Sequence, residues 1–132
     1  ELEKIILTKG KQKTTTKIEK KKSMAFFSAF KKFLNEHEKL REQAIGQYDF
    51  QLDLNKNEAN YQLEILKDAV AIRKKKTVKP LVKIEIEDTT LFNLYKKKLL
   101  LEEVLIQERI KLTGTKKNTE KLTQLLSKFL EN

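Results

Sequence analysis

The stretch that decides the fold is residues 23–76, SMAFFSAFKKFLNEHEKLREQAIGQYDFQLDLNKNEANYQLEILKDAVAIRKKK. Read as one α-helix, this stretch keeps a single apolar stripe in phase, because the steps along the stripe alternate between three and four residues. The stripe consists of Phe27, Phe30, Leu34, His37, Arg41, Ile45, Tyr48, Leu52, Asn55, Ala59, Leu63, Leu66 and Val70. The pattern therefore predicts one helix over residues 23–76, about 80 Å long at ~1.5 Å per residue.

Residues 47–66 also carry a competing strand pattern. Apolar and polar residues alternate over 48–54 and again over 61–65, and the segment 55–58 between them is rich in Asn. Taken alone, this pattern predicts a β-hairpin. We favour the helix, because the stripes before Gly46 and after segment 55–58 share one phase. The remaining apolar residues also line up on the opposite face of that helix, which would be sandwiched between neighbours.

The rest of the chain predicts two shorter helices that pack back on the long one. Residues 90–112 are apolar around much of a helical axis, and residues 119–131 carry a single apolar stripe. Alternating residues over 81–87, after Pro80, predict at most one short β segment. The expected fold is thus mainly α, a helical bundle or hairpin. Its expected division is a basic leader over 1–22 and one helical domain over 23–132.

The residue types argue against an enzyme. The chain has no cysteine and one histidine, so thiolate metal sites are excluded and a metal ion would depend on carboxylates. The three glycines are isolated, so no Gly-rich phosphate loop exists. His37 lies on the apolar stripe, where a lone histidine is typically partly buried and hydrogen-bonded. We therefore predict no catalytic residue, no cofactor, no metal and no small-molecule substrate.

A cluster of aromatic residues near the start of the long helix is the first candidate site. Four of the seven phenylalanines lie within eight residues. Such a cluster, if exposed, forms an apolar patch that a soluble monomer normally avoids. The predicted interface with partner subunits or with a second copy of the chain consists of Phe26, Phe27, Phe30, Phe33 and Leu34.

The basic charge supplies the second candidate site. The formal net charge is +10, and of 29 basic residues 26 are lysine and three are arginine. A positive balance favours anionic partners, although lysine-heavy usage also fits an AT-rich genome, and specific phosphate readers are typically arginine. The candidate phosphate contacts are Lys11, Lys13, Lys17, Lys20, Lys21, Lys22, Arg73, Lys74, Lys75, Lys76 and Lys79.

Three functions follow from these features. The favoured one is a non-enzymatic helical assembly component that docks on partner subunits or self-associates through the aromatic helix face. The alternatives are a sequence-independent nucleic-acid binder that uses lysine-rich segments and, third, a peripheral membrane-surface protein that uses residues 20–34. No signal peptide or transmembrane segment is visible, and the chain begins at Glu1, which indicates a fragment or a processed chain, so localisation stays unassigned.

Overall fold

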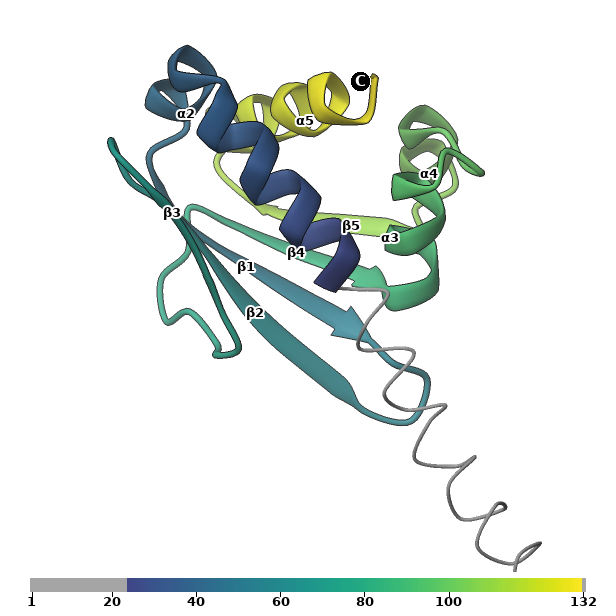
Figure 1. The fold of residues 1–132 in the computed structure, drawn as a ribbon. Coiled ribbons are helices and arrows are strands. Elements are labelled where there is room, and N and C mark those ends of the chain that lie inside the picture. Colours follow the sequence, from purple (N-terminus) through teal and green to yellow (C-terminus); the bar gives the residue numbers. More distant parts are fainter. Residues whose placement is uncertain (1–23, 132) are drawn as a thin grey trace, which may run out of the picture.

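The computed structural model describes residues 24–131, which form a five-stranded sheet with helices on one side (Figure 1). In chain order the elements are a helix over residues 24–36, α2 (Glu38–Gln43), β1 (Gly46–Asp53), β2 (Glu58–Ile65), β3 (Val70–Arg73), β4 (Val82–Glu87), α3 (Asp88–Tyr95), α4 (Leu101–Ile106), β5 (Ile110–Gly114) and α5 (Lys116–Glu131). The strand order is β3-β2-β1-β4-β5. β1 and β4 are parallel, and the other neighbouring strands are antiparallel.

The prediction of one long helix is wrong. The helix over residues 24–36 ends before His37, and after the short α2 the chain forms the β1–β2 hairpin in the segment that also carried the strand pattern. Alternation places Tyr48, Phe50 and Leu52 on one face of β1, opposite Leu63, Tyr61 and Ala59 of β2 in the register. Apolar residues that alternate with a period of two give a strand one buried face. The helical phase that the apolar residues before and after Gly46 share is coincidental.

The prediction of a helix over 90–112 is also wrong. This segment divides into α3, α4 and the edge strand β5, which pairs with β4. Lys97 and Glu108 have left-handed backbones, with φ of 62° and 56°, and each ends the helix before it. The strand expected around 81–87 exists as β4, but it is one of five strands in an α/β fold. The last predicted helix corresponds to α5.

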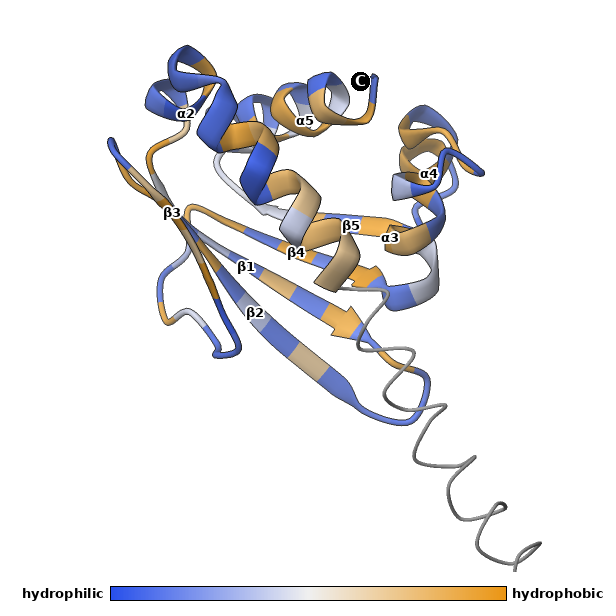
Figure 2. Cartoon of the chain, viewed as in Figure 1, coloured by the Kyte–Doolittle hydropathy of each residue, from blue (hydrophilic) through white to orange (hydrophobic). Residues whose placement is uncertain are grey.

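One face of the sheet packs against the helices and forms the core. Figure 2 shows hydrophobic and hydrophilic bands alternating along β1 and β4, as expected for strands with one buried face. On β4 the buried residues are Val82, Ile84 and Ile86, which pair in the parallel register with Tyr48, Phe50 and Leu52 of β1. The predicted single domain over 23–132 stays a prediction, and the predicted leader over 1–22 lies outside the described residues.

The opposite face of the sheet is polar, and its buried side chains include Asp49 of β1. Asp49 of β1 is almost fully buried there, because the connection from β3 to β4 passes over it. Asn60 donates from Nδ2 to Asp49 Oδ2 at 3.0 Å, and the backbone N–H of Thr77 donates to Oδ1 at 3.4 Å. On β2, Glu64 accepts hydrogen bonds from Arg73 and Gln47, which lower the pKa of its carboxyl.

The end of β5 requires glycine. A Cβ atom on Gly114 would lie 2.5 Å from the backbone oxygen of Leu81, which no small side-chain movement can relieve. We expect Gly114→Ala to lower the free energy of unfolding by about 2 kcal/mol, because the added methyl must push two backbone segments apart. Urea unfolding followed by circular dichroism measures the change, and a stability equal to wild type would contradict this packing.

Candidate apolar pocket between α3, α4 and α5

Aromatic side chains fill the centre of the molecule between the sheet and the helices. Phe26, Phe27 and Phe30 are fully buried. The ring of Phe27 lies 5.2 Å from that of Phe50 on β1, and the ring of Phe30 lies 5.0 Å from that of Phe129 on α5. The predicted partner interface is therefore part of this chain's own core, and the reasoning that required an exposed aromatic cluster is wrong.

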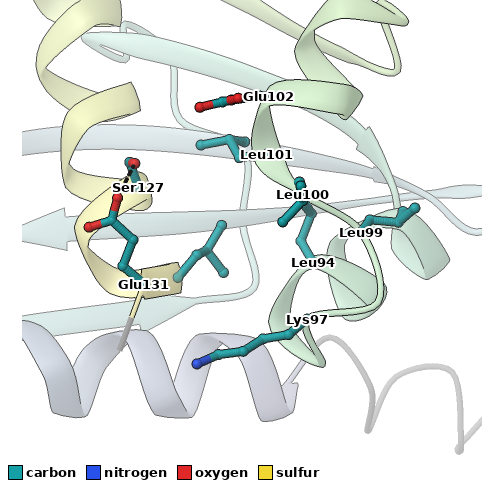
Figure 3. Close-up of a pocket in the computed structure, with 9 residues that line it drawn as sticks. Leu94, Lys97, Leu99, Leu100, Leu101, Glu102, Ser127 and Glu131 are labelled. Carbon is teal, nitrogen blue, oxygen red and sulfur yellow. Dashed lines mark hydrogen bonds between the residues drawn. The ribbon is translucent and has the colours of Figure 1, made fainter.

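The surface of the helical layer holds an apolar pocket of about 220 Å³. Five leucines line it: Leu94 of α3, Leu99, Leu100 and Leu101 at the start of α4, and Leu130 of α5. Figure 3 shows these side chains arranged around the space between α5 and the α3–α4 segment. The pocket thus joins residues that are far apart in the sequence.

The turn between α3 and α4 positions three of these leucines. The left-handed backbone of Lys97 reverses the chain, and its N–H donates to the backbone oxygen of Leu94 at 3.1 Å. The N–H groups of Lys98 and Leu99 both donate to the oxygen of Asn93. The leucines that follow are only partly covered, and Leu100 is 62% exposed. An exposed leucine beside a pocket is apolar surface that a ligand could cover.

Polar groups stand around the leucines. The pocket lining also includes Lys97, Glu102, Ser127 and Glu131. In Figure 3, Lys97 lies at one end of the pocket and Glu102 at the other, while the Ser127 hydroxyl donates to Glu131 Oε1 at 3.4 Å. Apolar walls with a few convergent polar groups are the usual composition of a small-molecule site.

α4 covers one side of the pocket and is lightly attached. Val104 is the one buried residue among its six. Its Ile106 is 81% exposed and does not line the pocket. Elements with few buried apolar contacts open most easily. Of the walls of the pocket, α4 should therefore need the least free energy to move when a ligand enters.

A second pocket of about 210 Å³ lies on the other side of α5, against α2. Leu40, Ala44 and Leu125 form its apolar part. Its polar lining is Gln43, Gln124, Lys121 and Lys128, with no carboxylate among them. The two pockets that flank α5 therefore differ in charge.

The described residues include five of the predicted phosphate contacts, at the end of β3 and in the connection to β4. Arg73 makes an ion pair with Glu64 at 2.8 Å, and Lys74, Lys75, Lys76 and Lys79 are exposed in the β3–β4 connection. The other predicted contacts, in segment 11–22, lie outside the described residues. Phosphate binding at these positions stays a prediction.

His37 is exposed, unlike the partly buried position that the apolar stripe predicted, and its ring makes local contacts. Its Nδ1 lies 2.7 Å from the backbone oxygen of Phe33, and its ring stacks on the ring of Phe33 at 4.2 Å. Within residues 24–131 no group of three or more metal-ligating side chains comes together, and no helix in this range could cross a membrane.

Sequence reasoning missed the leucine pocket. The consecutive leucines Leu99, Leu100 and Leu101 were assigned to a helix buried on nearly all sides. Three consecutive apolar residues cannot all face one core when a helix begins among them. This run of three leucines directly after three lysines was the feature of the sequence that could have indicated an apolar site near the surface.

Of three comparisons with known proteins, the one with solved structures identifies this fold. No family model matches the sequence, and no curated protein matches it significantly. Solved structures do match. The sterol carrier protein domain 2 of Helicoverpa armigera is 22% identical, with 83% of this chain and 87% of that chain covered and a TM-score of 0.69. Sterol Carrier Protein-2 from Aedes aegypti, solved in complex with the C16 fatty acid palmitate, is 18% identical over 83% of this chain and 94% of that one, with a TM-score of 0.63. Sterol Carrier Protein 2 from Yarrowia lipolytica, in its apo form, is 15% identical. The match covers 80% of this chain and 90% of that chain, with a TM-score of 0.59.

This likeness overturns the functional hypotheses drawn from the sequence. The helical assembly component and the membrane-surface protein were predicted from amphipathic helices, the nucleic-acid binder from the lysine-rich segments, and the absence of a small-molecule ligand from missing catalytic and cofactor motifs. The structural neighbours are instead α/β proteins, one of them solved with a fatty acid bound. The described residues of this chain have the fold of the sterol carrier proteins, a five-stranded mixed sheet with its helices on one side.

Proposed function

We propose that this chain is a non-enzymatic binding protein for a small apolar molecule of the lipid class. The observation that carries the proposal is the leucine-lined pocket between α3, α4 and α5. The fold adds support, because a protein of the same fold was solved in complex with palmitate. Each methylene moved from water into the pocket contributes about 0.8 kcal/mol to binding.

The size of the pocket defines how a ligand would bind. Its volume of about 220 Å³ is below the range of ~300–1,000 Å³ typical for sites that enclose a ligand. The ligand would therefore bury one part of its apolar body against the leucines, and α4 would move outward as more of that body enters. Leu100, exposed in the free protein, would be covered in the complex.

The binding test uses two exposed apolar residues near or on α4. Leu100→Asn removes an apolar side chain from the pocket lining, whereas Ile106→Asn removes one that lies outside it. Asn is a favourable residue at the N-cap position that Leu100 occupies, so this variant should fold at least as well as wild type. We expect Leu100→Asn to weaken binding of the uncharged dye Nile red about five- to tenfold, and Ile106→Asn to leave it unchanged.

Nile red fluorescence measures binding of the dye to both variants. A saturable titration in the micromolar range, weakened by the first change alone, would support the proposal. Absence of saturable binding, or equal losses in the two variants, would refute a site at this pocket.

A further inference from the structure

The polar side chains that line the pocket form its rim, and this rim carries a net negative charge, which is unusual for a site that binds a fatty acid. Its ionisable lining consists of Glu102, Glu131 and Lys97, which sum to −1 in a chain whose formal net charge is +10. Glu131 already accepts a hydrogen bond from the Ser127 hydroxyl, and Glu102 projects toward the same space from α4 (Figure 3). Within residues 24–131 no ion pair joins Lys97 to either glutamate.

The hydrogen-bonding capacity of this rim distinguishes lipid head groups. An ionised carboxylate only accepts hydrogen bonds, as do the carboxylates of the two glutamates, so a fatty-acid head would be repelled by both glutamates and could accept only from Lys97 or Ser127. A hydroxyl both donates and accepts. It could donate to Glu131 or Glu102 and accept from Ser127 or from the Lys97 ammonium.

We propose, resting on the proposed function, that this pocket selects lipids with an uncharged hydroxyl head group over lipids with a carboxylate. The carboxylates of Glu102 and Glu131 are the selectivity determinants, and the leucines bind the apolar body. The chain's overall positive charge does not reverse this selectivity, because fields from charges more than about 8 Å away are largely screened at physiological salt.

The test compares 1-decanol with decanoate, which have the same chain length and differ in the head group. Decanoate is fully ionised at pH 7.5, far above the ordinary pKa of a carboxyl group. Displacement of Nile red at physiological salt gives the two dissociation constants. We expect 1-decanol to bind about fivefold tighter than decanoate in the wild-type chain.

The variant Glu102→Gln/Glu131→Gln keeps the shape of the rim and removes both negative charges. In this variant we expect the dissociation constants of 1-decanol and decanoate to become equal, or decanoate to bind more tightly than 1-decanol. Glu103→Gln is the matched control, because Glu103 is exposed on the same helix and does not line the pocket, and its ratio should stay at the wild-type value. The variant Lys121→Gln/Lys128→Gln reports any decanoate held in the pocket between α2 and α5.

Two results would overturn the selectivity. One is decanoate binding as tightly as 1-decanol to the wild-type chain. The other is a decanol-to-decanoate ratio that the double glutamate variant leaves unchanged. Failure of the proposed function has a separate signature: Nile red would then show no saturable binding, or Leu100→Asn would have no effect on it. Saturable binding that responds to Leu100→Asn but shows no head-group preference would refute the selectivity alone.

Discussion

Replacing Phe27 by alanine is expected to lower the free energy of unfolding by about 3–5 kcal/mol. Phe27 is fully buried in the helix over residues 24–36 and joins that helix to the sheet. Its ring lies 5.2 Å from Phe50 of β1 and 5.1 Å from Tyr61 of β2. The substitution removes both aromatic contacts and leaves a cavity that the surrounding strands cannot close.

Urea unfolding followed by far-UV circular dichroism measures this loss. Met24→Ala is the matched control in the same helix, because Met24 is exposed and should change stability by less than about 1 kcal/mol. A site used for docking on another protein would behave differently. Phe27→Ala would then leave the stability of the monomer nearly intact and abolish an association that depends on protein concentration, and this outcome would contradict the core position of Phe27.

The second large effect is expected at Arg41, the one buried residue of α2. Its side chain is 8% exposed. Nη1 donates to the backbone oxygens of Leu34 and Asn35, each at 3.1 Å, and Nε donates to that of Lys67 at 3.0 Å. Arg41 therefore satisfies carbonyl groups at the end of the helix over residues 24–36 and links them to the β2–β3 turn.

Arg41→Ala should lower the free energy of unfolding by about 3 kcal/mol, because it removes three hydrogen bonds donated by a charged and almost fully buried group. Arg41→Lys should cause an intermediate loss, since a single ammonium cannot match the planar fork of the guanidinium. The exposed neighbour Lys39, replaced by alanine, is the control and should stay within about 0.5 kcal/mol of wild type. Thermal melts measure all three variants, and equal melting temperatures for Arg41→Ala and Lys39→Ala would refute the role.

The position of Arg41 also explains one error of sequence reasoning. On the predicted long helix, Arg41 occupied the apolar stripe with no obvious reason for a charge there. The structure supplies the reason: the chain turns at His37, so the guanidinium reaches back to carbonyl groups at the end of the preceding helix. A cation at a helix C-terminus is favourable, but the sequence shows this only once the end of the helix is known.

Local sequence patterns determined several elements of this protein. The single apolar stripe of α5 and the alternation in β4 were sufficient to place both. The alternating runs at 48–54 and 61–65 contained the β1–β2 hairpin, although the helical interpretation was preferred. These patterns are visible because each depends on residues within one window of the chain.

Tertiary structure decided the remainder. β1 is a central strand because β4, more than thirty residues later, pairs with its free edge. Hydrogen bonds across that distance make the strand conformation more stable than the helix that the same apolar residues could form, since propensity and periodicity are weak compared with pairing and burial. The pocket has the same origin. Leu94, Leu100 and Leu130 meet because α5 returns beside the α3–α4 turn, and no sequence window contains all three.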